Sequence, residues 1–245
     1  MEKLRVDMPH EPVPPRTPTR TRSPRAGGFT VVEVAVMVAV LALLASMAVP
    51  NYLGSRVASN EAAVVEALRS LVGAQARFRQ AAHIDRDLDG VGEYGTLGEL
   101  AGRRPLPGPS EPTGDHLIPA ALGDTGPEGR VQIDSYWFAI HLADAEGHGT
   151  PDGPENRERM DPVYAERHWT CIAWPVEHGV TGEHTFFVNE QGELRKNRTE
   201  RYSGTNRIPP AGAARVGARG PHQITRGRLA TNELGSDGGV WLLVK

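Results

Sequence analysis

The pattern of apolar and polar residues divides the chain into one unbroken apolar run near its amino terminus and a longer, mixed remainder. The run extends from Phe29 to Val49 and holds a single charged residue, Glu33. As an α-helix these residues would span about 31 Å, which is the thickness of one bilayer core. The pattern therefore predicts a transmembrane helix with an acid near its start.

A second helical segment is predicted directly after Pro50, because apolar residues there recur with the spacing of one helix face. The stripe consists of Val57, Val64, Leu68, Leu71, Val72 and Phe78. Proline removes a backbone donor and bends a helix. We therefore expect one long helix, from Phe29 to about Ala81, that is bent or locally broken at Pro50 and packs its second half against the rest of the chain.

The remainder predicts short strands, rich in aromatic and β-branched residues and separated by loops of glycine, proline and charged residues. Strands are expected at residues 131–142 and 169–175, in a hairpin over 185–195, and at 240–244. Surface loops are expected at 103–129 and 144–161, and a polar, irregular tail at 202–239. The expected fold class is α+β, a long amino-terminal helix packed on a small antiparallel sheet.

The residues around the acid contain a more specific signal. Gly28 directly precedes Phe29, and Glu33 is the fifth residue after that glycine. This arrangement resembles the processing site of the type IV pilin and type II secretion pseudopilin superfamily, and Pro50 matches a helix-bending proline common there. The resemblance implies that a prepilin peptidase cuts between Gly28 and Phe29, that Phe29 is N-methylated, and that Glu33 acts in assembly.

The resemblance also implies an organisation and a function. Residues 1–28 would be a cytoplasmic leader that is removed, 29–50 a membrane and filament-core helix, and 51–245 a periplasmic pilin-like domain. The chain would be a structural subunit of a type II secretion pseudopilus, and a type IV pilin is the alternative. Its partners would be copies of itself, other pseudopilins or pilins, and an inner-membrane assembly platform.

Charge predicts the orientation in the membrane. Residues 1–28 contain six lysines and arginines against three acids, so the positive-inside rule keeps this end cytoplasmic. Removing the leader would change the net charge of the chain from −3 to −6. An acidic ectodomain argues against nucleic acid as a partner.

Glu33 has two interpretations. Cleavage would create a free amine on Phe29, and pairing this amine with Glu33 of a neighbouring subunit would neutralise both charges and set the axial register. Alternatively, Glu33 lies at the headgroup level of an ordinary anchor. A secretory signal peptide cut near residues 46–48, or a plain signal anchor, would also contain such an apolar run.

A second segment predicts a metal site. Asp85, Asp87 and Asp89, followed by Gly90, reproduce the first half of a calcium loop, with Glu93 as a further ligand. The Val91 carbonyl is an alternative ligand. The twelfth loop position is Thr96, where an EF-hand has a bidentate glutamate, so any cage here differs from an EF-hand.

The aspartates also fit a solvated turn that binds no metal. For the whole chain, an alternative function is that of a signal-anchored periplasmic calcium-binding module that does not polymerise. Thr96 and Glu99 form the pattern of a capping box that opens a short helix.

The sequence predicts no enzyme. Its nine histidines are scattered and form none of the usual metal-binding spacings, and there is no nucleophile elbow or phosphate loop. The single cysteine, Cys171, lies between two tryptophans and is expected to be a buried apolar residue. With one cysteine the chain forms no internal disulfide.

Overall fold

The computed structural model describes residues 28–107, 116–153 and 155–244. Most of the predicted leader, residues 1–27, lies outside the described residues. The described residues divide into two compact units, one that ends at Met47 and one that begins at Ala48. Helix α1, Val31–Gln80, contributes to both units and continues through Pro50, so the proline does not end the helix. The long predicted helix is confirmed.

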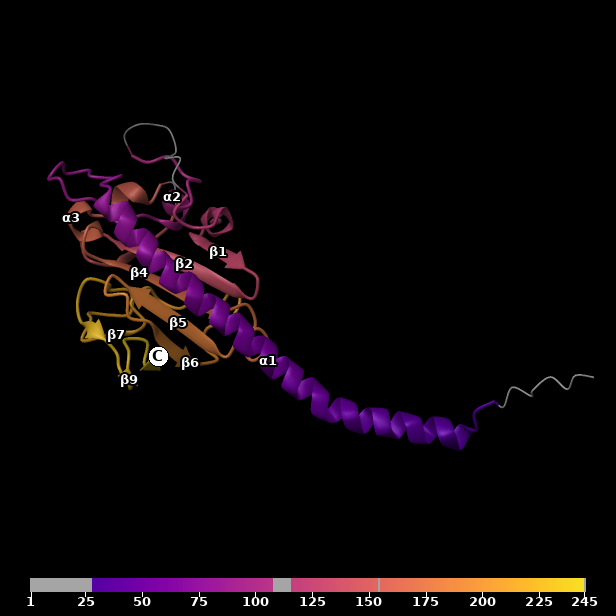
Figure 1. Cartoon of the computed structure of the whole chain (residues 1–245). Coiled ribbons are helices and arrows are strands. Elements are labelled where there is room, and N and C mark those ends of the chain that lie inside the picture. The colour runs from indigo at the N-terminus through magenta and orange to yellow at the C-terminus, as the bar shows by residue number, and fades with distance from the viewer. Residues whose placement is uncertain (1–27, 108–115, 154, 245) are drawn as a thin grey trace, which may run out of the picture. The chain divides into compact units, whose positions relative to one another are not determined.

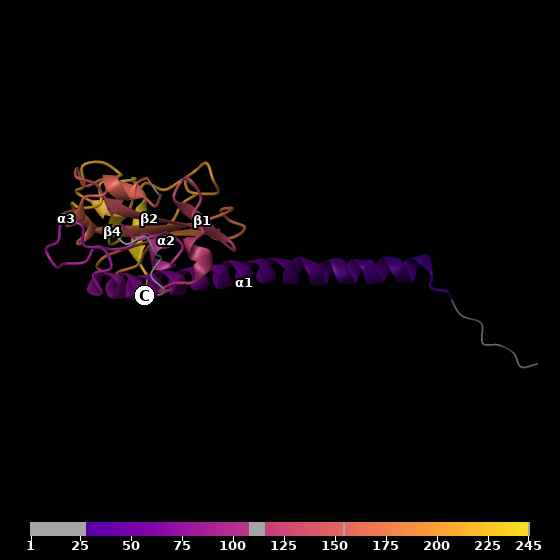
Figure 2. The same ribbon diagram turned by 90° about the horizontal axis from the view of Figure 1, so that it is seen from above.

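In the second unit, the carboxyl-terminal part of α1 packs on one face of an antiparallel sheet (Figures 1 and 2). Val64, Leu68, Leu71 and Phe78 of the predicted stripe are buried there, and Val57 and Val72 are partly buried. The stripe therefore faces the sheet, as its spacing predicts.

The main sheet has the strand order β1-β2-β4-β5-β6-β10-β9, with β3 paired to β2, and every pair is antiparallel. The strands are β1 Arg130–Ile133, β2 Tyr136–Ala143, β3 Gly149–Pro151, β4 Trp169–Pro175, β5 His184–Asn189, β6 Arg195–Arg198, β9 Glu233–Leu234 and β10 Val240–Leu243. A small second sheet pairs β7, Arg215–Val216, with β8, Arg228–Leu229. The short helices are α2 Leu97–Leu100, η1 Ala120–Gly123, η2 Arg157–Arg159 and α3 Pro162–Ala165.

The predicted strands are present with other boundaries, but β3 lies in a predicted loop, and β7, β8 and β9 lie in the segment predicted as an irregular tail. The segment predicted as one strand over 131–142 is a hairpin, because the chain reverses at Asp134, whose φ is 49°. The hairpin predicted over 185–195 is formed by β5 and β6, with its second strand shifted to 195–198. The α+β layout, with one long apolar helix and an antiparallel sheet, is therefore present.

The sheet separates the two larger of three hydrophobic cores in the described part of the chain. Alternate residues of β4 face opposite sides, so Cys171 packs in the core under α1 and Trp174 packs in the other core. The second core is closed by the segment predicted as a polar tail. Figure 2 shows this segment as a layer across the sheet from α1. Its contributions are Tyr202, Ala213, Ala214, Leu229 and Ala230, together with Trp241 of β10.

Candidate functional site

The start of α1 is fixed by two side chains. The Thr30 backbone N–H and hydroxyl donate to Oε2 of Glu33 at 2.8 and 2.9 Å, and the Glu33 backbone N–H donates to the Thr30 hydroxyl at 3.2 Å. These reciprocal bonds form a capping box that starts the helix. Sequence reasoning missed this role of Glu33, although Thr30 and Glu33 have the three-residue spacing that signals it.

The first half of α1 presents an apolar surface that the described residues do not cover. The large apolar side chains from Phe29 to Leu53 are each 44–87% exposed. This helix is long and apolar enough to cross a membrane, and its apolar window is entirely unburied. The window differs from the core helix of a soluble protein, which is mostly buried, whereas a signal sequence near the amino terminus would have the same length and composition.

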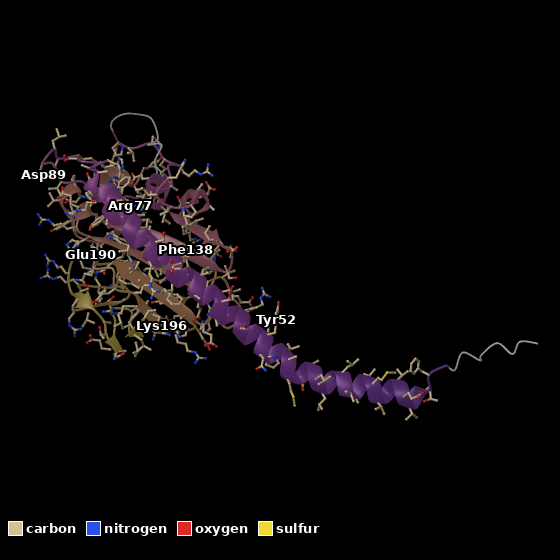
Figure 3. All side chains as sticks on the ribbon, in the orientation of Figure 1. Tyr52, Arg77, Asp89, Phe138, Glu190 and Lys196 are labelled. Carbon is tan, nitrogen blue, oxygen red and sulfur yellow. The ribbon has the colours of Figure 1, made fainter. Side chains whose placement is uncertain are left out.

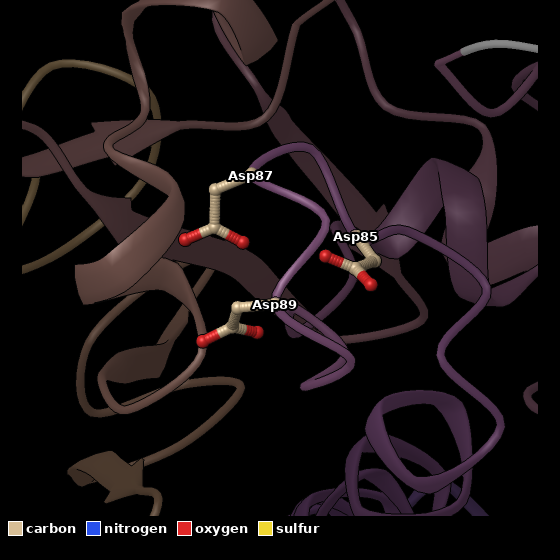
Figure 4. Close-up of side chains that lie close together, drawn as sticks. All are labelled: Asp85, Asp87 and Asp89. Carbon is tan, nitrogen blue, oxygen red and sulfur yellow. The ribbon is translucent and has the colours of Figure 1, made fainter.

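The loop after α1 brings the predicted aspartates together. One carboxylate oxygen from each of Asp85, Asp87 and Asp89 lies within 4.8 Å of the other two (Figure 4). Asp85 Oδ2 accepts from the Gly90 N–H at 3.0 Å, and Asp89 Oδ1 accepts from the Val91 N–H at 2.8 Å. Figure 3 shows Asp89 in the loop past the carboxyl-terminal end of α1.

Two contacts close this loop on the rest of the domain. The Glu93 N–H donates to the Ile84 carbonyl at 2.8 Å, which joins the two ends of the loop. The Gln75 side chain of α1 then bonds both the N–H and the carbonyl of Gly95, at 2.9 and 2.8 Å. The backbone that supports the aspartates is therefore fixed on both sides.

Glu93, the predicted fourth ligand, does not join the three aspartates. Its side chain is fully buried and accepts from Arg86 Nη2 at 2.8 Å and from Arg157 Nη2 at 3.0 Å. Oε1 of Glu93 is also occupied, by the Arg86 Nε at 2.9 Å. A buried carboxylate requires such partners, and this one obtains them from arginines. Arg157 was not predicted, because it lies far along the chain.

The Arg157 guanidinium also contacts Glu99 Oε2 at 3.3 Å. Glu99 accepts from the Thr96 N–H at 2.7 Å, and Thr96 accepts from the Glu99 N–H, so the predicted capping box of α2 is confirmed. Arg86 donates to the carbonyls of Arg157 and Met160 as well. This network joins the loop to η2 and has a structural role.

Another acid, which sequence reasoning missed, lies near the aspartates. Glu166 caps the carboxyl end of α3 and is 3% exposed. Its Oε1 is buried and has no hydrogen-bond partner among the described residues. Burial raises the pKa of Glu166, and the charges of Asp89 and Asp87 raise it further. No local sequence pattern relates Glu166 to the loop.

Comparison of the chain with protein-family models, with curated proteins and with solved structures found no match in any of the three. The function of the chain must therefore follow from its own residues and geometry. Two features offer chemistry beyond packing: the capped, exposed start of α1 and the acidic loop that follows its end.

Proposed function

We propose that this chain is a structural subunit of a type II secretion pseudopilus. A prepilin peptidase removes residues 1–28 by cutting between Gly28 and Phe29, and Phe29 is then methylated. The main support is the start of α1, where Gly28 and Phe29 precede an exposed apolar helix that contains one acid, Glu33.

The exposed surface of α1 requires a cover, since it would otherwise place many apolar side chains in water. In the proposed function the inner membrane covers it first, and the same helices of neighbouring subunits cover it after assembly. Both surroundings are apolar, so one surface is suited to both. The domain that contains the sheet would lie in the periplasm, opposite the basic leader.

Glu33 would have two successive roles. In the single chain its Oε2 caps the helix through Thr30, while Oε1 forms no hydrogen bond with any described residue. After cleavage, Oε1 would accept from the Phe29 amine of the neighbouring subunit. A charge pair inside an apolar assembly tolerates little displacement, so it would fix the axial position of each subunit.

If the chain is instead a type IV pilin, residues 1–50 would have the same roles, and only the machinery that assembles the filament would differ. A signal-anchored calcium-binding module that stays monomeric is the other candidate, and the grouping of Asp85, Asp87 and Asp89 is the observation that favours it. Cleavage after Gly28 is expected for both kinds of filament subunit and not for this module, so it distinguishes between them.

The first test is mass spectrometry of the amino terminus of the chain, produced in cells with and without a prepilin peptidase. With the peptidase, the mature protein should start at N-methyl-Phe29, and without it the leader should remain. A mature start near Val49, or an intact leader in both cells, would contradict the proposal.

The second test separates the two roles of Glu33. Glu33→Gln retains an oxygen that accepts from Thr30, whereas Glu33→Ala loses both the cap and the charge. Both variants should insert into the membrane and be cleaved, yet both should be recovered in filaments at least tenfold less than the unsubstituted chain. If Glu33→Gln assembles normally, the acid is only a helix cap and the pairing proposal fails.

A further inference from the structure

We infer that strands β9 and β10 form a binding surface for a second copy of this chain, and that this surface receives the exposed apolar part of the other copy's α1, around Val49 and Leu53. The inference rests on the proposed function, because it names a contact between two subunits of the filament.

Three large apolar side chains gather on these two neighbouring strands. Leu234 of β9 and Val240 and Leu242 of β10 are 39–60% exposed. Val240 pairs directly with Leu234, and alternation along the strand puts Val240 and Leu242 on the same side of the sheet. These three residues are called the β10 face below. Grouped apolar side chains on a surface mark a contact with another molecule more often than single ones do.

The strand register shows that the β10 face lies on the side of the sheet that α1 covers. Leu242 pairs with Lys196 of β6, and Lys196 pairs with Phe186 of β5. Residues paired in this way point to the same side, and Phe186 is buried in the core under α1. Val244, which follows Leu242 on that side, packs against the same core. The β10 face therefore continues the surface on which α1 already packs.

The sheet has room for one more helix beside α1. Glu61 bonds to His184 at the start of β5, and Val72 lies beside Gly192 in the turn after β5, so α1 runs along this strand. Strand β10 is two strands away from β5, or about 10 Å. The axes of packed helices are about 8–10 Å apart. Figure 1 shows β6 and β9 to one side of α1. A second helix in contact with α1 would therefore lie over the β10 face.

The chain itself contains the helix that fits this surface. Lys196 lies next to Leu242 and brings a positive charge, so a basic partner is disfavoured. Residues 34–55 contain no charged residue, and Val49 and Leu53 are about half exposed. Residues four apart on a helix are about 6 Å apart, close to the ~6.6 Å between alternate residues of a strand such as β10. Val49 and Leu53 of another copy can therefore both contact the β10 face.

This contact joins two different surfaces of the same chain. Each copy carries the β10 face and the exposed part of α1, so a copy that receives one helix can offer its own helix to the next copy. A contact of this kind repeats without closing unless the rotation between copies forms a ring. It is therefore suited to a filament and not to a two-fold dimer.

The test is disulfide cross-linking of the full chain in cell membranes and in filaments, with Leu53→Cys and Leu242→Cys in one chain. The natural cysteine, Cys171, is buried and should not react. Oxidation should produce a ladder of covalent multimers, whereas Leu242→Cys alone should stay monomeric. The matched control combines Leu53→Cys with Leu243→Cys, because Leu243 is similarly exposed but lies on the opposite side of the sheet. It should yield at least tenfold less multimer.

A charge on the β10 face should also impair assembly. Leu242→Glu should be recovered in filaments at least fivefold less than the unsubstituted chain, and Leu243→Glu should be recovered normally. Thermal melting in micelles shows whether each variant is folded, and both should melt close to the unsubstituted chain.

Two results would overturn the inference. One is the absence of a ladder from the double cysteine variant, and the other is efficient dimer formation by Leu242→Cys alone, since the β10 face would then contact its own copy. Cleavage after Gly28 is measured separately on the same samples. A cleaved chain without a ladder would contradict this contact and leave the proposed function standing, whereas a ladder from an uncleaved chain would do the reverse.

Discussion

One loop contains a buried, paired acid, Glu93, and a group of three unpaired aspartates, and the surroundings of the two are opposite. Glu93 is fully buried and bonded to Arg86 and Arg157, whereas the aspartates at positions 85, 87 and 89 are half-buried or exposed and have no ion-pair partner among the described residues. The acids differ little in chemistry. The contrast shows that the cations which the fold brings to a carboxylate determine whether it stabilises the fold or is free for a ligand.

The largest expected loss of stability comes from removing the charge of Glu93, the paired acid. Glu93→Gln leaves two arginines without their shared carboxylate, and removing one partner of a buried pair costs about 3–5 kcal/mol. The loss should lie toward the lower value, because Arg157 keeps its contact with Glu99. Chemical unfolding of the full chain in micelles with EDTA measures it, and Glu177→Gln should stay within about 0.5 kcal/mol of the unsubstituted chain. A loss below about 1 kcal/mol would mean that the pairing is not what stabilises this region.

A paired acid that is only partly buried should show an intermediate effect. Glu61 of α1 accepts from the backbone N–H groups of Glu183 and His184, at 2.9 and 3.0 Å, and lies 2.9 Å from the His184 ring Nδ1. Burial by itself would raise the pKa of Glu61, but the bonds from His184 and Glu183 outweigh it and lower the pKa below 4.5. Glu61→Gln should cost about 1 kcal/mol at pH 7.

The pH dependence of that cost gives the sharper test. Because the pKa of Glu61 is lower in the folded chain than in the unfolded chain, the stabilisation is complete above about pH 4.5 and is lost as the pH falls through the folded value. The difference between the unsubstituted chain and Glu61→Gln should therefore shrink at acid pH. Glu66→Gln, on an exposed position of the same helix, should show no such trend. A difference that is constant from pH 3 to pH 7 would exclude this origin.

The smallest effect, and one of opposite sign, is expected for the unpaired group. In EDTA, Asp89→Asn removes one of three mutually repelling charges and keeps the oxygen that accepts from the Val91 N–H. Stability should stay unchanged or rise by about 0.5 kcal/mol, as measured by melting without calcium. A loss above about 1 kcal/mol would show that Asp89, like Glu93, is required by the fold itself.

The features that could be predicted from the sequence are those formed by residues close together in the chain. The apolar stripe of α1, the capping box at Thr96 and the grouping of the aspartates depend on residues close together in the chain, and all three are present. Arg157 and Glu166 approach the loop from far along the sequence, so no local period or spacing indicates them. The second core escaped prediction because it uses small residues such as Ala213, Ala214 and Ala230, which give no recognisable strand or helix period.

Trp241 has a consequence for how the chain acquires this structure. It is fully buried in the second core, on strand β10. Strand β10 pairs with β6, although the whole segment that covers the sheet lies between these two strands in the sequence. Pairing between such distant segments is slow, because the intervening chain must be ordered first. In a chain that emerges amino terminus first, the edge of β6 and one apolar face of the sheet stay open until β10 arrives. Open edges of this kind recruit other chains. We therefore expect aggregation to compete with folding in the interval before β10 docks.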